Sequence, residues 1–304
     1  MIIKRITQYD TLSVMKIWKE CFTNDIEYIS TFIRESLPHT ITLGLSLNRS
    51  ESIVSMLSLM PAYSFTRERE EIPLNGGYLY GVGTLTEHRG RGYSALLIEE
   101  AFNIALENNW SFMVVRPAEE SLYNLYKRES FNIVLNEREL IIEIDAFLKE
   151  NSSMRGYCTK AQVIEKESYF DIREHSLKES HILWSRAIFN YAYIEAIGRG
   201  GNFYMLESAS KEPTIYALYP NSSSHLNIID HNINSLDILI KVVKEITKSY
   251  PSHSTLNISF SPISLSKEIE KLCSPNKNSL IKIFTKNSQE SATLTSKIIS
   301  LPIE

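Results

Sequence analysis

The sequence predicts an α+β (α/β) fold, with mixed β-sheets flanked by helices and divided between two domains. Stretches with an apolar period of two alternate with stretches of helical period along the chain. The length of 304 residues suits two domains of about 100–200 residues each. A polar stretch without an apolar period, KENSSMRG at 149–156, separates the halves. We therefore expect domains at 1–148 and 149–304.

The first half predicts the order strand, two helices, three strands, helix, strand, helix, strands. A strand at 2–6 precedes a helix from Asp10, whose expected apolar stripe runs from Leu12 to Phe22, and a second helix lies between Asp25 and Pro38. The charged stretch 66–71 predicts a hairpin tip. The remaining elements are strands at 40–47, 52–60 and 78–86, a helix from Gly92 to Asn108, a strand at 111–115, a helix at 119–129 and a β-rich run at 131–144.

The second half repeats part of this order. Its periodicity predicts strands near 203–207, 214–218 and 225–230, a helix at 235–248, a strand at 255–260, a helix at 265–273 and a strand at 279–284. The two halves are therefore expected to be tandem copies of one fold. Trp184, Phe189, Tyr191 and Tyr193, at helical spacing, are expected in the core. The glycines at 198–201 predict a hairpin turn, because a strand follows them.

Composition excludes several classes of protein. Lys and Arg number 32 against 36 Asp and Glu, so the net charge of −4 argues against a strongly basic nucleic-acid binder. The three cysteines, Cys21, Cys158 and Cys273, are too scattered for a disulfide framework or a zinc site, and the histidines show no metal-ligand spacing. No apolar run reaches the ~18 residues of a membrane helix, and the N-terminus lacks a signal-peptide core. We expect a cytoplasmic protein without a metal.

The distribution of glycine indicates where the chemistry lies. Only 11 glycines occur, and six of them fall between Gly76 and Gly92. The segment VGTLTEHRGRGYSALL at 82–97 lies between a predicted strand and a predicted helix. Glycines let the backbone approach an anion, and a helix start presents unpaired N–H groups to it. With Arg89 and Arg91 beside them, these groups predict a cradle for a pyrophosphate.

Three phosphate-binding patterns compete for this segment. The P-loop pattern GxxxxGK[ST] is absent. The dinucleotide pattern GxGxxA is formally present at 90–95, but no acidic residue ends the next strand. Arg116 stands there instead, and it could suit a phosphorylated ribose, so an NADP-binding enzyme stays an alternative. The third pattern, Arg89-x-x-Gly92-x-Ser94, resembles the acetyl-CoA loop of the GNAT superfamily of N-acetyltransferases.

The resemblance extends through the first half. The predicted element order of 1–145 is that of a GNAT domain, and the strand before the loop ends in Val82-Gly83-Thr84. The run 122–131, LYNLYKRESF, is similar to the family signature Y-x-x-x-G-F, with Ser130 in place of glycine. Length and loop are most similar to bacterial acetyltransferases of the enhanced-intracellular-survival type, which add a degenerate second GNAT-like domain and a sterol-carrier-like domain. The chain is too short for the latter, so their hexamers and their aminoglycoside or lysine substrates are not carried over.

The resemblance implies roles for individual residues. Pantetheine would lie along Val82, Gly83 and Thr84, with Gly83 in a bulge that frees an N–H for the oxyanion. Tyr126 matches the general acid that protonates the leaving thiolate, and Tyr123, one helical turn earlier, is the substitute. The pyrophosphate would be held by Arg89, Gly90, Arg91, Gly92, Tyr93, Ser94 and Ala95.

The general base stays open at this point. Glu87, His88 and Glu119 are candidates, directly or through water, and the resemblance adds the carboxylate of the C-terminal Glu304. Each also has an ordinary interpretation, as a solvated side chain or as a charge at a helix start. Glu68, Glu70 and Glu71 could attract a cationic amine together with Glu87, although Arg67 and Arg69 between them favour a solvated hairpin.

The resulting hypothesis is an acyltransferase that moves an acetyl group from acetyl-CoA directly to a primary amine of a small molecule or peptide, in a ternary complex. A non-catalytic acyl-CoA-binding sensor is the alternative, and an NADP-binding enzyme is the third. We expect one cofactor site, in 1–148, because 149–304 has no glycine loop. The second domain is expected to close the substrate cleft or to form a homodimer face. No nucleic acid or membrane partner is expected.

Overall fold

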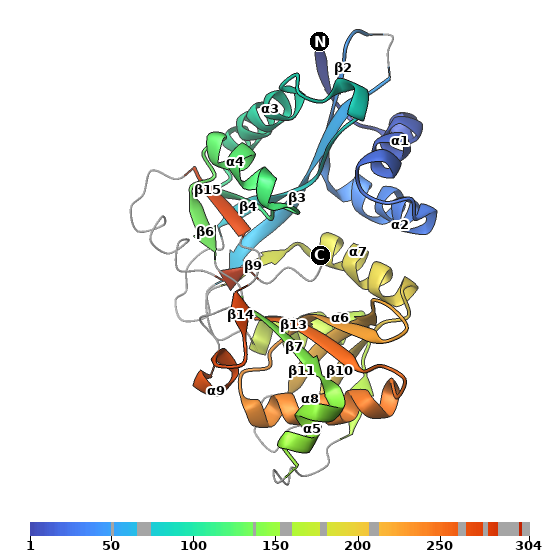
Figure 1. Cartoon of the computed structure of the whole chain (residues 1–304). Coiled ribbons are helices and arrows are strands. Elements are labelled where there is room, and N and C mark those ends of the chain that lie inside the picture. Colours follow the sequence, from blue (N-terminus) through green and yellow to red (C-terminus); the bar gives the residue numbers. More distant parts are fainter. Residues whose placement is uncertain are drawn as a thin grey trace.

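The computed structural model of the chain describes residues 1–49, 52–65, 74–135, 138–152, 160–176, 181–206, 213–260, 266–275, 279–284 and 298–299. These residues form two mixed β-sheets, one in each of two units that lie one above the other in Figure 1. Helices flank both sheets. The predicted fold class is confirmed.

The first unit is a sheet in the order β1-β2-β3-β4-β5-β15-β6, with β9 beside β3 and β16 beside β9. Helices α1 and α2 cover one side of it, and α3 and α4 cover the other (Figure 1). Its elements are β1 (Ile2–Arg5), η1 (Gln8–Asp10), α1 (Thr11–Cys21), α2 (Ile26–Thr31), η2 (Phe32–Ser36), η3 (Leu37–His39), β2 (Ile41–Ser46), β3 (Ser55–Phe65), β4 (Asn75–Thr84), η4 (Thr86–His88), α3 (Tyr93–Glu107), β5 (Phe112–Val115), α4 (Glu120–Arg128), β6 (Ile133–Leu135), β9 (His181–Trp184), β15 (Ser279–Ile283) and β16 (Ile298–Ile299).

The second unit is a sheet in the order β14-β7-β13-β12-β11-β10-β8. Helices α5 and α8 pack on one face, and α6 and α7 pack on the other. Its elements are β7 (Arg138–Glu143), α5 (Ile144–Glu150), β8 (Ala161–Val163), α6 (Lys166–Ser176), α7 (Arg186–Gly198), β10 (Asn202–Leu206), β11 (Thr214–Pro220), β12 (His225–His231), α8 (Leu236–Ser249), β13 (Thr255–Phe260), α9 (Lys267–Glu270) and β14 (Ser274–Pro275).

The two sheets repeat one topology and exchange a strand. Each has a single parallel pair on its main path, β4–β5 in the first sheet and β12–β13 in the second. The next place in the first sheet is taken by β15, from the C-terminal half. The equivalent place in the second sheet is taken by β7, which lies before the expected boundary. Strand pairing therefore crosses the expected boundary at 148/149 in both directions, and that boundary stays a prediction.

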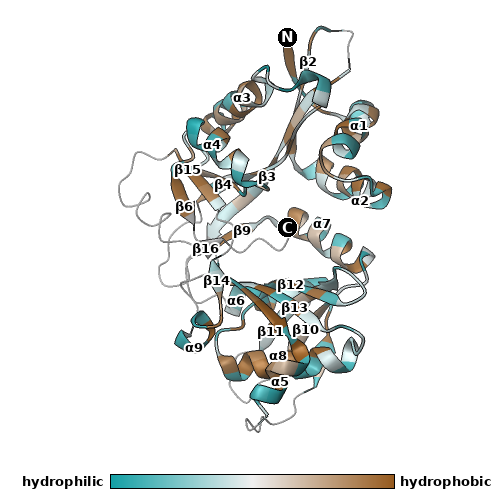
Figure 2. Cartoon of the chain, in the orientation of Figure 1, coloured by the Kyte–Doolittle hydropathy of each residue, from teal (hydrophilic) through white to brown (hydrophobic). Residues whose placement is uncertain are grey.

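Buried apolar residues form one cluster in the first unit and one on each face of the second sheet. Helix α7 joins two of them, because Tyr191 packs in the first unit and Phe189 packs against the second sheet. The helices of both units carry hydrophobic residues beside hydrophilic ones, as expected of helices that cover a sheet (Figure 2). Helix α7 thus ties the second unit to the first.

Several local predictions need correction. Leu12 was expected in the apolar stripe of α1, but it is 83% exposed and the helix buries Val14, Ile17 and Trp18 instead. The glycines at 198–201 do not turn a hairpin. They end α7, where Gly200 has a φ of +79° and Gly201 N–H bonds the carbonyl of Ala196. The predicted hairpin tip at 66–71 lies outside the described residues.

Candidate active site

Strands β4 and β5 separate at the centre of the first sheet. They pair from Gly76 opposite Phe112 to Leu79 opposite Val115, and β4 then continues to Thr84 paired with β3 but no longer with β5. A parallel pair that opens in this way leaves the backbone groups of one strand edge available to a ligand. The sequence predicted the two strands but not the point at which they separate.

A β-bulge lies where the strands part. In the β3–β4 pair, Met56 faces Gly83 and Ser58 faces Tyr80, so Gly81 and Val82 together oppose one residue. Gly81 carries the positive φ of +59° that this bulge requires. The prediction of a bulge at Gly83 is therefore wrong. Gly83 is paired in the ladder, and its lack of a side chain instead admits the close packing of α1.

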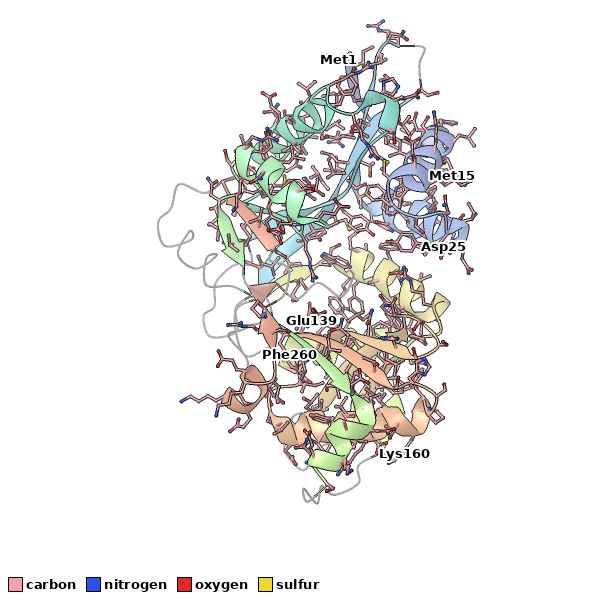
Figure 3. All side chains as sticks on the ribbon, in the orientation of Figure 1. Met1, Met15, Asp25, Glu139, Lys160 and Phe260 are labelled. Carbon is pink, nitrogen blue, oxygen red and sulfur yellow. The ribbon has the colours of Figure 1, made fainter. Side chains whose placement is uncertain are left out.

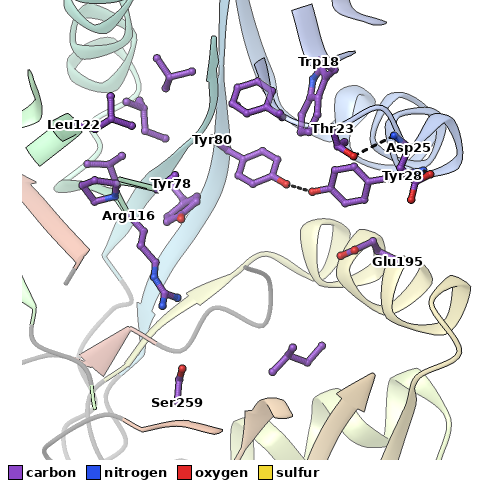
Figure 4. Close-up of a pocket in the computed structure, with 18 of the residues that line it drawn as sticks. Trp18, Thr23, Asp25, Tyr28, Tyr78, Tyr80, Arg116, Leu122, Glu195 and Ser259 are labelled. Atoms are coloured by element: carbon purple, nitrogen blue, oxygen red, sulfur yellow. Dashed lines mark hydrogen bonds between the residues drawn. The ribbon is translucent and has the colours of Figure 1, made fainter. Parts of the chain in front are cut away.

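A cavity of about 700 Å³ opens at this separation and lies between the two units. Figure 4 shows its walls, and Figure 3 labels Asp25 and Glu139, which come from opposite units. The first unit supplies an aromatic wall, and the second unit supplies polar side chains. Residues that line the cavity include Asp25, Tyr28, Tyr80, Gly81, Val82, Arg116, Tyr126, Glu139, Glu195, Arg199, Tyr219, Asn257 and Ser259.

The predicted phosphate loop leads directly into α3. Gly90 and Gly92 have φ values of +74° and +77°, and a Cβ on either would meet no atom within 4 Å. The backbone conformation therefore requires glycine there, and crowding does not. Gly92 is the N-cap of α3 and no side chain caps the helix, so its first amides point outward. An anion at this position would receive N–H groups and the positive end of the helix dipole.

The two loop arginines brace the turn. Arg89 Nε donates to the carbonyl of Thr84 at 3.0 Å, and Arg91 Nη2 donates to the carbonyl of Glu87 at 3.2 Å. Cys21 Sγ also approaches the Thr84 carbonyl, at 3.4 Å. The Thr84 carbonyl is therefore engaged by protein groups.

The predicted catalytic candidates fall in different places. Tyr126 is buried and, like Val82, lines the cavity, whereas Tyr123 packs at the margin of the first core. The Glu87 side chain is 70% exposed and lies 3.8 Å from Lys16 and 3.6 Å from His88. Neither Glu87, His88 nor Glu119 lines the cavity. Glu68, Glu70, Glu71 and Glu304 lie outside the described residues.

Three cavity carboxylates were missed by sequence reasoning. Asp25 is exposed and accepts the N–H of Tyr28 at 3.0 Å, which caps α2. Glu139 on β7 accepts Nδ2 of Asn257 at 2.8 Å. Glu195 on α7 is buried and ion-paired with Arg199. Glu139 and Glu195 are far from the loop in the chain, so no local motif could have connected them to it.

A tyrosine pair stands at the mouth of the strand separation. Tyr80, the first β4 residue after the β4–β5 pairing ends, shares a hydroxyl–hydroxyl hydrogen bond with Tyr28, drawn as a dashed line in Figure 4. Burial raises the pKa of Tyr80 well above its usual value, so both phenols are neutral. The Arg199 guanidinium lies over the rings of Tyr28 and Tyr219, at 5.2 and 5.1 Å.

Burial also acts on Glu195. It raises the pKa of that carboxyl, with Asp25 adding to the rise and Arg199 opposing it. A carboxylate in this setting is a better proton acceptor than an exposed one.

The equivalent gap in the second sheet is bridged. Strands β12 and β13 stop pairing after Ile228 and Ile258, and beyond that point the His231 ring bonds the carbonyl of Ser259. Beside it, Arg173 and Asp230 form a buried ion pair, with Nε and Oδ2 2.5 Å apart. In addition, α8 is capped by Ser235, unlike α3.

A parallel pair that opens beside a glycine-headed helix, next to a cavity with a buried tyrosine, is the arrangement that the sequence resemblance predicts. Residues 2–131 match the family model described as the acetyltransferase (GNAT) domain. No curated protein matches the chain by sequence.

Solved structures show the same fold over both units. A probable N-acyltransferase from Enterococcus faecalis is 13% identical with a TM-score of 0.68, over 93% of this chain and 72% of that one. A GCN5-related N-acetyltransferase from Kribbella flavida is 10% identical with a TM-score of 0.68, over 93% and 70%. Eis1 from Mycobacterium abscessus is 8% identical with a TM-score of 0.61, over 93% and 74%.

Two features are absent from the part of the chain that the structure describes. None of the helices formed there is long and apolar enough to span a membrane. Within the same part of the chain, no group of three or more histidine, cysteine and acidic side chains is arranged to hold a metal ion.

Proposed function

We propose that the protein is an acetyl-CoA-dependent N-acetyltransferase that transfers the acetyl group directly to a primary amine of a small molecule or peptide. The observation that carries this proposal is the open gap between β4 and β5. It leads from the uncapped start of α3 into the cavity between the units. Acetyl-CoA has the matching shape, with a pyrophosphate at one end of a narrow pantetheine arm and the reactive thioester at the other.

A second pocket supports this placement of the cofactor. It has a volume of about 330 Å³ and begins at Gly92 and Ala95. Arg128 and Lys282 also line it, with Lys282 Nζ 3.3 Å from the centre of the Phe102 ring. We assign it to the phosphorylated adenosine end of CoA, because two cations there can meet a phosphate.

The reaction then needs three protein groups. An N–H freed by the bulge at Gly81 and Val82 would hydrogen-bond the thioester oxygen as it becomes an oxyanion. Tyr126 would protonate the leaving thiolate. The neutral amine, held in the cavity, would attack the carbonyl carbon. Residues Arg89 to Ala95 would hold the pyrophosphate.

Binding and turnover test the proposal separately. Acetyl-CoA should raise the melting temperature and NADP should not, and dephospho-CoA should bind more weakly than CoA because it lacks the phosphate that faces Arg128 and Lys282. Thiol release from acetyl-CoA should then depend on an added primary amine. Stabilisation by NADP without stabilisation by acetyl-CoA would reject the proposal.

The second candidate is a non-catalytic acyl-CoA sensor. The observation in its favour is that Glu87, His88 and Glu119 all lie outside the cavity lining. Tight acetyl-CoA binding without thiol release across small amines and peptide N-termini would favour it. The NADP alternative loses its support, because the loop lies in a mixed sheet and not in a doubly wound parallel one.

Assembly and location stay predictions. We propose that the second unit closes the acceptor cleft, because Glu195, Arg199 and Tyr219 line it. A homodimer and a cytoplasmic location are also proposed, from composition and resemblance alone.

A further inference from the structure

The cavity offers three carboxylates to an acceptor amine, and they differ in burial and in partners. Asp25 is exposed and its carboxylate is engaged in capping α2. Glu139 is half-buried and accepts a hydrogen bond from Asn257. Glu195 is only 9% exposed, and its partner is a cation. Of the three, Glu195 is the most desolvated, and Arg199 is the neighbour that favours its ionised form.

Glu195 also lies on the acceptor side of the strand separation. In Figure 4 Glu195 lies below Tyr28, and its charge adds to the rise in the pKa of Tyr28, whose hydroxyl bonds that of Tyr80. Tyr80 stands where β5 leaves β4. The thioester of a CoA arm laid in the gap would emerge beside Tyr80. An amine that attacks this thioester would therefore lie in the part of the cavity lined by Tyr80, Tyr28 and Glu195.

We propose that Glu195 is the catalytic carboxylate that binds the ammonium group of the acceptor and takes its proton, and that Arg199 is a positioning residue that sets its basicity. Tyr28 and Tyr80 then orient the nitrogen through their hydroxyls. This inference rests on the proposed function, because it names a role within the same reaction. It gives the second unit a direct part in the chemistry, since α7 carries both Glu195 and Arg199.

The proton balance of the step is closed. The acceptor arrives as R–NH3⁺ and gives one proton to the Glu195 carboxylate. The neutral amine forms the N–C bond, the C–S bond breaks, and the thiolate takes a proton from Tyr126. The second proton of the former ammonium leaves the nitrogen and restores Tyr126 through solvent. Glu195 releases its proton to bulk water, so one proton appears for each acetyl transfer.

The groups that face Glu195 come from three elements. Arg199 and Tyr191 lie on α7 itself, and Asp25 and Tyr28 lie at the start of α2. Tyr80 on β4 is the third element's contribution, through its hydrogen bond to Tyr28. The positive charge of Arg199 favours the ionised carboxylate, and Asp25 disfavours it. Removing Arg199 should therefore make Glu195 harder to ionise, and removing Asp25 should make it easier.

The pH profile of kcat/KM is the decisive test. Glu195→Gln should lower kcat/KM about 10²-fold, a typical loss for general base catalysis, and remove the limb that rises with pH on the acid side. Arg199→Met should move that limb to higher pH, which a merely structural residue would not do, and Asp25→Asn should move it to lower pH. Glu195→Asp should restore part of the rate.

The chain supplies matched controls. Glu245 on α8 is equally buried and also ion-paired, with Lys248, but it does not line the cavity. Glu245→Gln should leave the pH profile of kcat/KM unchanged. This control separates the effect of losing a buried ion pair from the effect of losing the catalytic base. If Glu139→Gln removes the acid limb while Glu195→Gln keeps it, the inference is wrong.

A measurement without turnover keeps the inference apart from the proposed function. Carboxyl carbon NMR of the whole protein, assigned with Glu195→Gln, should show Glu195 titrating above the exposed glutamates, and higher still in Arg199→Met. If Glu195 titrates with the exposed glutamates, the inference fails even where acetyl transfer occurs. If no amine supports thiol release, the proposed function fails instead.

Discussion

Nε2 of His231 donates to the carbonyl oxygen of Ser259 at 3.0 Å, across the point where β12 and β13 stop pairing. The other ring nitrogen, Nδ1, accepts the N–H of Ile233 at 3.1 Å. Both hydrogen bonds together require the neutral imidazole with its proton on Nε2. The first sheet has no such bridge between β4 and β5 among the described residues, so the two copies of one topology differ at the point where a CoA arm would enter.

This bridge makes stability depend on pH. Burial lowers the pKa of His231 below its ordinary value of 6.5, so the unfolded chain binds the proton at a higher pH than the folded one. Stability is therefore complete above pH ~6.5 and falls as the pH falls toward the folded pKa, by at most about 1.4 kcal/mol for each unit of lowering. Urea unfolding at pH 7.5 and 5.5 measures this, and His231→Gln should reduce the difference. His225→Gln, at an exposed position of the same strand, should not.

The glycine turn predicts a loss specific to the cofactor. Gly92→Ala forces an alanine to a φ of +77°, at a cost of about 1–2 kcal/mol. It should also weaken acetyl-CoA binding, because the start of α3 must shift to relieve that strain. Gly200→Ala is the matched control, because Gly200 has a φ of +79° and equally open surroundings, far from the loop in sequence. Unfolding measurements should show equal losses of stability for the two variants. Calorimetric titration with acetyl-CoA should show a changed Kd only for Gly92→Ala. Equal Kd values would place the pyrophosphate elsewhere.

The end of α4 predicts a stabilising substitution. Ser130 has a φ of +68°, and the bonds from Phe131 N–H to Tyr126 O and from Ser130 N–H to Lys127 O form a Schellman motif. Glycine relieves the strain of this conformation, so Ser130→Gly should raise the free energy of unfolding by about 0.5–1 kcal/mol. Asn109 ends α3 in the same way with a φ of +54°, and because asparagine tolerates this conformation, Asn109→Gly should gain less. Denaturant midpoints for both variants check the order.

The tyrosines of α4 predict a contrast in rate. Tyr126 lines the cavity and Tyr123 does not, so Tyr126→Phe should lower kcat about 10²-fold with little change in KM. Tyr123→Phe should leave kcat within about twofold. Steady-state thiol release measures both. A wild-type rate in Tyr126→Phe would remove the assignment of Tyr126 as the acid.

Most of the local structure could be predicted from the sequence. The apolar periods locate most elements to within a few residues, and Gly90 and Gly92 identify the turn, because only glycine takes a positive φ there without strain. Tyr126 is found from its spacing to Ser130 and Phe131. The bulge was misplaced because two glycines, Gly81 and Gly83, suit it equally by sequence, and only the register of β3 decides between them.

The sequence by itself determined most elements, the glycine turn before α3 and the match of residues 2–131 to an acetyltransferase domain, since these depend on residues close together in the chain. The tertiary structure decided which strands share a sheet, that β7 and β15 exchange between the halves, and that Glu195 and Arg199 line one cavity with Tyr80. An apolar alternation shows that a strand has a buried face but not which partner covers it. A side chain carried by α7 enters the site only through packing between segments more than a hundred residues apart.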